Sequence, residues 1–221
     1  MTAPIVWAVT AVAVLGALAL ATVTDPLAAV RDPVAARDAI ALMQAGEHAT
    51  YVAEYAYTRA DLHGRKYTST EYDVRGPKGT LTRNGTSLAI DWNGQGSDCT
   101  MASAKPSCLA RPVANGLPES EVLRVAVDAG IYDVTRAPDT TIAGEPARCF
   151  VIRAHRLDKQ LPNDFGSESD MCFDARGVPL RFRRYTDELN GLEALGVGPF
   201  DRAALAPVIA GFDRTAPQVG R

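Results

Sequence analysis

The sequence predicts an α+β protein. An N-terminal transmembrane helix is expected to lead into a curved antiparallel β-sheet, a half-barrel, whose apolar face is covered by short helices. Three observations support this prediction. An uncharged apolar run lies near the N-terminus. Short alternating segments separated by turn residues follow, as is typical of an antiparallel meander. Two helical patterns, one before and one within this series, can cover one face of the sheet.

The apolar run has the length of a membrane span. Residues 5–23 are apolar almost throughout, and no charged side chain precedes Asp25. As an α-helix they extend roughly 28 Å, close to the ~30 Å hydrocarbon core of a bilayer. We therefore expect a transmembrane anchor at residues 1–24 and a linker at residues 25–32. The alternative is a cleaved signal peptide, which usually begins with basic residues, whereas the first basic residue here is Arg31.

The charge and the motifs argue against several function classes. The 221 residues carry a formal net charge of −3, whereas nucleic-acid binders present a basic face to phosphates. The GSESD stretch at residues 166–170 lacks the second glycine of a nucleophile elbow. No histidine lies within four residues of a cysteine, as a zinc site of common spacing would require. We expect no enzymatic activity, no cofactor, no metal and no nucleic-acid partner.

The first helix of the domain is expected to begin at Asp32-Pro33. Aspartate is a good N-cap, proline suits the first helical position, and Gly46 favours the end of the helix. Its predicted apolar side is made by Ala36, Ile40 and Met43.

Four strands are then predicted, at residues 50–61, 66–75, 80–84 and 86–93, with glycine-containing turns between them. In the first strand, one face carries Tyr51, Ala53, Tyr55 and Tyr57. These tyrosines either pack against the first helix as ordinary core or line a cavity between helix and sheet.

A second helix is predicted at residues 118–130, with an apolar side made by Val122, Val125, Ala126 and Ala129. Further strands follow at residues 131–138, 147–155, 169–175 and 177–185. In the last of these, alternation turns Val178, Leu180 and Phe182 inward. The half-barrel domain is thus predicted to cover residues 33–190. Residues 191–221, which contain three prolines, are predicted to be an irregular tail with short helical turns.

The cysteines are predicted to form two disulfides. If Cys149 faces Cys172 across an antiparallel strand pair, one register serves both the bridge and the apolar face. In that register the other face brings together Phe150, Ile152, Met171 and Phe173. A slip of one residue would break both agreements. This bridge would close a loop of about two dozen residues, contributing about 3 kcal/mol by chain entropy.

The second bridge joins Cys99 and Cys108 across a short loop. The alternative is two unpaired thiols in a cytosolic domain. Because disulfides persist outside the cytosol, we expect a single-pass cell-membrane protein with residues 25–221 extracytoplasmic, or a secreted one if the N-terminal segment is cleaved. Arg31 and Arg37, just after the apolar run, favour the opposite orientation by the positive-inside rule.

The layout resembles a known class. AIALMQAGEHATYVAEYAYT is a helix feeding the first strand, and AGEPARCFVIR and SDMCFDARGVPLRFRRY lie near the end. Over residues 36–186 this order is similar to the LolA/LolB/LppX half-barrel proteins and to sensor proteins of the RseB/MucB kind. The resemblance implies a periplasmic or cell-surface domain in which a sheet curls around helices and shelters acyl chains.

Two functions follow from these observations. The first is a membrane-anchored, extracytoplasmic, non-enzymatic binding protein for a lipid, a lipoprotein or another apolar ligand. Its expected ligand lining comprises Tyr51, Tyr55, Tyr57, Phe150, Ile152, Phe173 and Phe182. The alternative is a structural or regulatory envelope ectodomain with a filled core, which acts by protein contact. An apolar pocket of several hundred Å³ under the sheet would favour the first, and a filled interior with an exposed apolar patch would favour the second.

Overall fold

The computed structural model describes residues 32–212, except for residues 62, 103–104, 114–115, 156–164 and 186–188. The predicted anchor, residues 1–24, lies outside the described residues, as does the linker up to residue 31. Within the described ranges, no helix combines the length and the apolar character needed to cross a bilayer.

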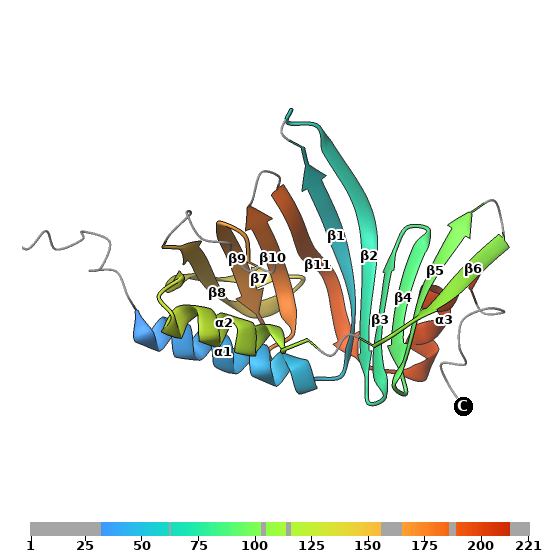
Figure 1. Ribbon diagram of the computed structural model, residues 1–221, viewed down its shortest axis with the longest axis horizontal. Helices are drawn as coiled ribbons and strands as arrows, with labels where there is room; N and C mark the ends of the chain where they lie inside the picture. Colours follow the sequence, from blue (N-terminus) through green and yellow to red (C-terminus); the bar gives the residue numbers. More distant parts are fainter. Residues whose placement is uncertain are drawn as a thin grey trace, which may run out of the picture.

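One open antiparallel sheet of eleven strands, in the order β6-β5-β4-β3-β2-β1-β11-β10-β9-β8-β7, forms the framework (Figure 1). The strands are β1 (Tyr51–Ala60), β2 (Lys66–Gly76), β3 (Gly79–Asn84), β4 (Ser87–Trp92), β5 (Gln95–Ala102), β6 (Lys105–Arg111), β7 (Tyr132–Ile142), β8 (Glu145–Ala154), β9 (Glu168–Phe173), β10 (Pro179–Tyr185) and β11 (Leu189–Pro199). The helices are α1 (Pro33–His48), α2 (Glu119–Asp128), the 3-10 helix η2 (Arg202–Ala204) and α3 (Leu205–Ile209). The last strand, β11, pairs with the first, β1. The α+β class and the curved antiparallel sheet are confirmed.

Helix α1 begins and ends as its sequence predicts. The Asp32 carboxylate accepts hydrogen bonds from the backbone N–H groups of Val34 and Ala35, at 3.0 and 2.9 Å, which satisfies two free donors of the first turn. Near the other end, a Cβ atom at Gly46 would lie only 2.1 Å from the carbonyl oxygen of Gly177. Glycine at both positions therefore lets the end of α1 touch the β9–β10 turn.

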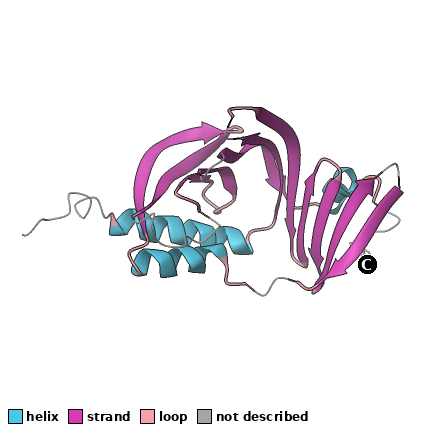
Figure 2. Ribbon diagram, turned by 45° about the horizontal axis from the view of Figure 1, so that its top comes forward, coloured by secondary structure: helices cyan, strands magenta, loops and turns pink. Residues whose placement is uncertain are grey.

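Helices α1 and α2 lie side by side beneath the arch of the sheet (Figure 2). The buried residues of α1 are Ala35, Ala36, Ala39, Met43 and Gly46, and Ile40 packs against them. The predicted apolar side of α2 is partly wrong. Leu123 and Ala126 face the core, whereas Val125 is 46% exposed. Two apolar stripes are present in this valine-rich helix, and packing against α1 and β7 selects the one that contains the larger leucine.

Strand β11 corrects the prediction for the C-terminal part. The irregular tail expected from residue 191 is wrong for its first part, because Leu189–Pro199 is a strand paired with both β1 and β10. Gly191, Gly196 and Gly198 interrupt the side-chain alternation that would have revealed it. The helical turns expected after it are present as η2 and α3.

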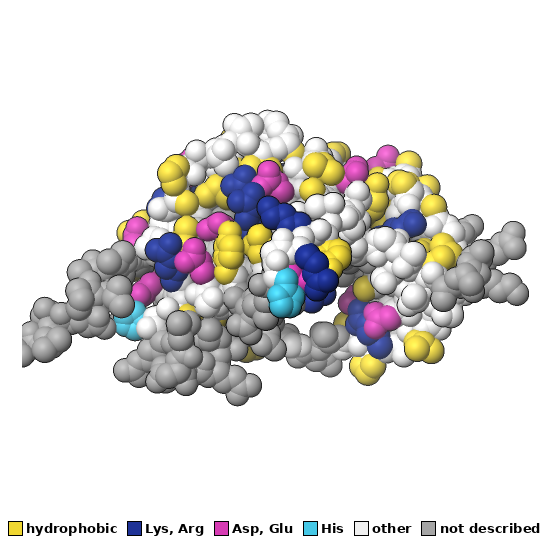
Figure 3. Space-filling model, turned by 90° about the horizontal axis from the view of Figure 1, so that it is seen from above, with side chains coloured by type: hydrophobic (Ala, Val, Ile, Leu, Met, Phe, Trp, Pro, Cys, Tyr) yellow, Lys and Arg dark blue, Asp and Glu magenta, His cyan; other side chains and the backbone are white. Residues whose placement is uncertain are grey.

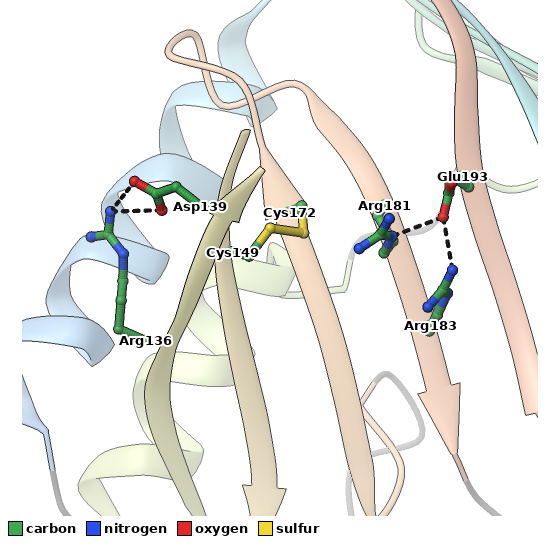
Figure 4. The surroundings of a disulfide bond; sticks show 7 residues. All are labelled: Arg136, Asp139, Cys149, Cys172, Arg181, Arg183 and Glu193. Carbon is green, nitrogen blue, oxygen red and sulfur yellow. Dashed lines mark hydrogen bonds and ion pairs between the residues drawn. A yellow bond between two sulfur atoms is a disulfide. The ribbon is translucent and has the colours of Figure 1, made fainter. Parts of the chain in front are cut away.

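Both predicted disulfides are confirmed. Cys149 pairs with Cys172 across β8 and β9 with a Cα–Cα distance of 4.1 Å, and Phe150 pairs with Met171 in the same register. Cys99 pairs with Cys108 across β5 and β6 at 4.0 Å. Figure 4 shows the first bridge beside ion pairs of Arg136 with Asp139 and of Glu193 with Arg181 and Arg183.

Helices cover opposite faces of the sheet in its two halves. Over β7 to β10, one face packs against α1 and α2, with Phe150, Ile152 and Phe173 in that core. Over β2 to β5, the other face is buried, and Val74, Leu81 and Ile90 pack against Leu205, Val208 and Phe212 of the α3 region. Strand register establishes the switch. Tyr55 lies on the helix-covered face of the sheet and pairs with Glu71 of β2. On β2, that same face therefore carries polar side chains.

Candidate functional site

A half-open cleft of about 800 Å³ lies where the covered face changes. Its floor is the face of the sheet that carries α1 and α2 in one half and is uncovered in the other. The C-terminal end of α1 and residues 117–119 complete its rim. The two halves of the sheet contribute different side chains to it.

The apolar part of the cleft comes from β9, β10 and β11. Phe182 pairs with Met171 on one side and with Leu192 on the other, so the three side chains form a row across these strands. Met43 of α1 and Phe173 of β9 extend this surface. Alternation along each strand turns these side chains to the face that carries α1. Met171 and Phe173 are buried there, whereas Phe182 and Leu192 are half-buried.

Two tyrosines of the central strand β1 lie between the apolar and polar parts. The Tyr51 hydroxyl donates a hydrogen bond to the Asp73 carboxylate at 2.7 Å, and the Tyr55 hydroxyl donates to the Pro179 carbonyl at 2.7 Å. Both rings are almost fully buried. Burial raises the pKa of both phenols far above the ordinary value of 10, so both remain neutral hydrogen-bond donors.

The polar part comes from β2, β3 and β4, with the lining residues Glu71, Asp73, Arg75, Thr80, Thr82 and Asp91. Asp73 accepts hydrogen bonds from Tyr51 and from the Thr82 hydroxyl, the latter at 3.1 Å. Glu71 accepts one from the Asn84 side-chain amide at 2.9 Å. Burial raises the pKa of both carboxyl groups above their ordinary values, because desolvation penalises the ionised form.

Three other charged groups of the cleft have structural partners. The Arg75 guanidinium donates to the backbone carbonyl of Glu47 at 2.9 Å, and the Glu47 carboxylate accepts from the backbone N–H of Ser120 in the first turn of α2. Asp91 forms an ion pair with Arg111 at 2.9 Å. Glu47 thus fastens the start of α2 to the end of α1, and Arg75 fastens that end to β2.

The acidic character of the cleft differs from the outer surface. On the face shown in Figure 3, Lys and Arg side chains lie interspersed with Asp and Glu side chains. Within the cleft, Glu71 and Asp73 have no ion-pair partner among the described residues, and their hydrogen-bond donors are neutral. Arg75 offsets part of the Asp73 charge, and the polar end still carries net negative charge when both groups are ionised, because its lining holds more acidic than basic side chains.

Four of the seven predicted lining residues contribute to the cleft, namely Tyr51, Tyr55, Phe173 and Phe182. Phe150 and Ile152 lie instead in the closed core under α1 and α2. Tyr57 is half-buried, and its hydroxyl donates to the Asn190 side chain at 2.9 Å.

The sequence analysis missed Met43, Met171 and Leu192 as lining residues, and it missed the carboxylates of β2. One signal could have revealed the latter. Alternation along KYTSTEYDVR places Glu71, Asp73 and Arg75 on a single face.

Comparison with known proteins gives likenesses of fold. No protein-family model and no curated protein sequence matches the chain. Among solved structures, MucB is 13% identical with a TM-score of 0.49, over 75% of this chain and 59% of MucB. LprF from Mycobacterium bovis is 11% identical with a TM-score of 0.43, over 78% of this chain and 97% of LprF.

A LolA superfamily protein, NE2245 from Nitrosomonas europaea, is 6% identical with a TM-score of 0.32, over 74% of this chain and 94% of that protein. For MucB, the chain matches about three fifths of that protein's length. The chain is similar in fold to these solved structures.

Proposed function

We propose that this protein is a non-enzymatic binding protein that holds the apolar part of a lipid, a lipoprotein or another amphipathic ligand in the cleft. The observation that carries the proposal is the cleft of about 800 Å³ with a continuous apolar side. Ligand sites of proteins are concave, mostly apolar, and roughly 300–1,000 Å³ in volume. The cleft has this size, and its Met and Phe side chains can adapt to an acyl chain.

The shape of the cleft suits a ligand with two chemically different ends. Met171, Phe182 and Leu192 offer an apolar surface on one side, and the carboxylates of β2 lie on the other. The cleft is also open to solvent along part of its length. An amphipathic molecule can therefore bury its chain while its head remains hydrated.

We also propose that the domain works outside the cytosol, anchored to the membrane by residues 5–23 or secreted after their removal. The support is the pairing of all four cysteines in two bridges, since such bridges persist in oxidising compartments. A domain held at a membrane surface would meet its lipid or lipoprotein there.

The test is native mass spectrometry of the full-length protein after gentle detergent extraction. Leu192→Trp replaces a leucine side chain of the cleft by a bulkier indole ring. Leu195→Trp is the matched control, because Leu195 lies on the same strand and is 58% exposed. The wild-type and Leu195→Trp proteins should carry added mass that denaturation releases as lipid, and Leu192→Trp should carry much less.

Protein that is bare in every preparation and does not take up added fatty acid or lipid would contradict the proposal. So would a Leu192→Trp protein that retains as much lipid as its control. If the lipid-free protein were instead found in a stoichiometric complex with another protein, a regulatory ectodomain that acts by protein contact would explain the data better.

A further inference from the structure

Two carboxylates of β2 share the floor of the cleft. Glu71 pairs with Tyr55 and Asp73 pairs with Ala53 across β1 and β2, so both point to the face on which Tyr55 lines the cleft. Their spacing along one strand puts the two groups roughly 7 Å apart. A single small head group can therefore reach both.

The charge of Arg75 offsets part of the charge of Asp73, but the lining of the cleft holds more acidic than basic side chains. The Arg75 guanidinium donates to the Glu47 carbonyl, and the Glu47 carboxylate caps α2. Asp91 is paired with Arg111. Glu71 and Asp73 receive hydrogen bonds from neutral amide and hydroxyl groups. Such donors satisfy some oxygen lone pairs but carry no formal charge, so the one cation Arg75 leaves the two carboxylates with net negative charge.

A cationic group would compensate this charge. Burying a carboxylate is unfavourable unless it is paired, and desolvation raises the pKa of both groups although the charge of Arg75 acts against this rise at Asp73. An ionised carboxylate pair has several acceptor positions in total, so an ammonium or guanidinium group could donate to both members. Among the described residues, no group of three or more His, Cys, Asp or Glu side chains is placed to hold a metal ion. This arrangement favours an organic cation.

We infer that the polar end of the cleft binds the cationic, N–H-donating head of an amphipathic ligand through Glu71 and Asp73, while the chain of the ligand lies against Met171, Phe182 and Leu192. The inference rests on the proposed function and narrows its ligand class to amines or guanidinium compounds with an apolar tail.

The experiment compares decylamine, decanol and decanoate, which share one chain length and differ in head-group charge. Binding to the wild-type protein is measured by calorimetry at neutral pH in low salt, below the concentration at which each probe aggregates. Decylamine should bind about tenfold more tightly than decanol, and decanoate more weakly than either. The preference for the amine should shrink as salt is added, since salt screens the charges.

Two variants assign the preference to the carboxylates. Glu71→Gln with Asp73→Asn should reduce the preference for decylamine over decanol to less than about twofold. Glu54→Gln is the control, because Glu54 lies on the neighbouring strand and pairs with Tyr72 on the opposite face. It should retain the preference. The wild-type salt dependence tests the same point without any variant.

The outcomes distinguish a failure of the cation-binding inference from a failure of the proposed binding function. If the three probes bind the wild-type protein equally, or if the double variant keeps the preference for the amine, the inference is overturned while the proposed function stands. If none of the three probes binds, the proposed function itself fails.

Discussion

Helices cover opposite faces in the two halves of this sheet, and the difference explains why the cleft exists. On the β7–β10 side, α1 and α2 cover one face, and the large core side chains there, such as Phe150, point toward them. On the β2–β5 side, α3 covers the reverse face and Val74, Leu81 and Ile90 point the other way. Neither set of helices covers the first face over β2 and β3. Polar side chains occupy it, and the cleft forms at the boundary.

The covers of the two halves are also held differently. Helices α1 and α2 are long enough to bury an apolar stripe, and the Gly46–Gly177 contact brings α1 against the sheet. Helix α3 has five residues, and Arg83 holds it in addition to its apolar packing. Arg83 donates to the carbonyls of Pro207, Val208 and Ala210 at 2.9 to 3.2 Å and lies 5.6 Å from the centre of the Phe212 ring.

The largest expected effect is in the first half. Phe150 is fully buried against α1 and Phe173, so Phe150→Ala should lower the free energy of unfolding by about 3–5 kcal/mol, through lost burial and a residual cavity. Urea denaturation monitored by circular dichroism measures this. A loss below about 1 kcal/mol would show that the α1/α2 core is loosely packed.

The disulfides offer a direct comparison of the halves. The Cys149–Cys172 bridge spans 23 residues and Cys99–Cys108 spans 9. Replacing each pair by alanine should cost about 3.4 and 2.6 kcal/mol respectively, because the longer loop restricts the unfolded chain more. Urea titrations of the two variants test the order. A larger loss from the 99–108 pair would mean that native packing, and not loop length, determines the effect.

Removing the Arg83 contacts to α3 should reduce the stability of the protein by an intermediate amount. Arg83→Ala removes the three hydrogen bonds to the end of the helix and should lower the free energy of unfolding by about 2–3 kcal/mol. Arg65→Ala is the control, since Arg65 is an exposed residue paired with Asp61, and it should change stability by less than about 0.5 kcal/mol. Faster hydrogen exchange confined to residues 202–212 would confirm that α3 is released. Unchanged exchange there would contradict the assignment.

The smallest expected effect concerns pH. Glu71 and Asp73 have folded-state pKa values raised above 4.5 and 3.8. Each folded carboxyl therefore holds its proton more tightly than in the unfolded chain. The resulting stability is full below pH 4 and is lost as pH rises through the folded pKa values. Each unit of difference contributes about 1.4 kcal/mol.

Comparing urea unfolding of the wild-type protein with the Glu71→Gln, Asp73→Asn variant isolates this contribution. The stability of the variant relative to wild type should increase between pH 4 and pH 7. A constant difference over this range would show that the two carboxyls are no less solvated in the folded protein than in the unfolded one.

The sequence predicts the sheet well where two constraints coincide. A disulfide between Cys149 and Cys172 and an apolar face containing Phe150 and Ile152 each constrain the strand register, and a single register satisfies both. Where only one signal exists, prediction fails. Glycines remove the pattern from β11, and the valines of α2 offer two equivalent faces.

The cleft could be predicted only in part. Alternation shows that Glu71 and Asp73 share a face, but it cannot tell a solvent-exposed face from the floor of a cleft. That distinction depends on where α1 ends and on which face α3 covers, which are properties of the packed molecule.

Photolabelling tests most directly the central claim that the cleft at the boundary of the two halves holds an apolar chain. A fatty amine with a diazirine near the end of its chain is irradiated with the full-length protein, and the labelled peptides are identified by mass spectrometry. Labels should fall on Met43, Met171, Phe182 or Leu192, and excess decylamine should remove them. Labels that fall chiefly on Leu109 or on residues 205–212 of the other half, or that decylamine does not remove, would contradict the account.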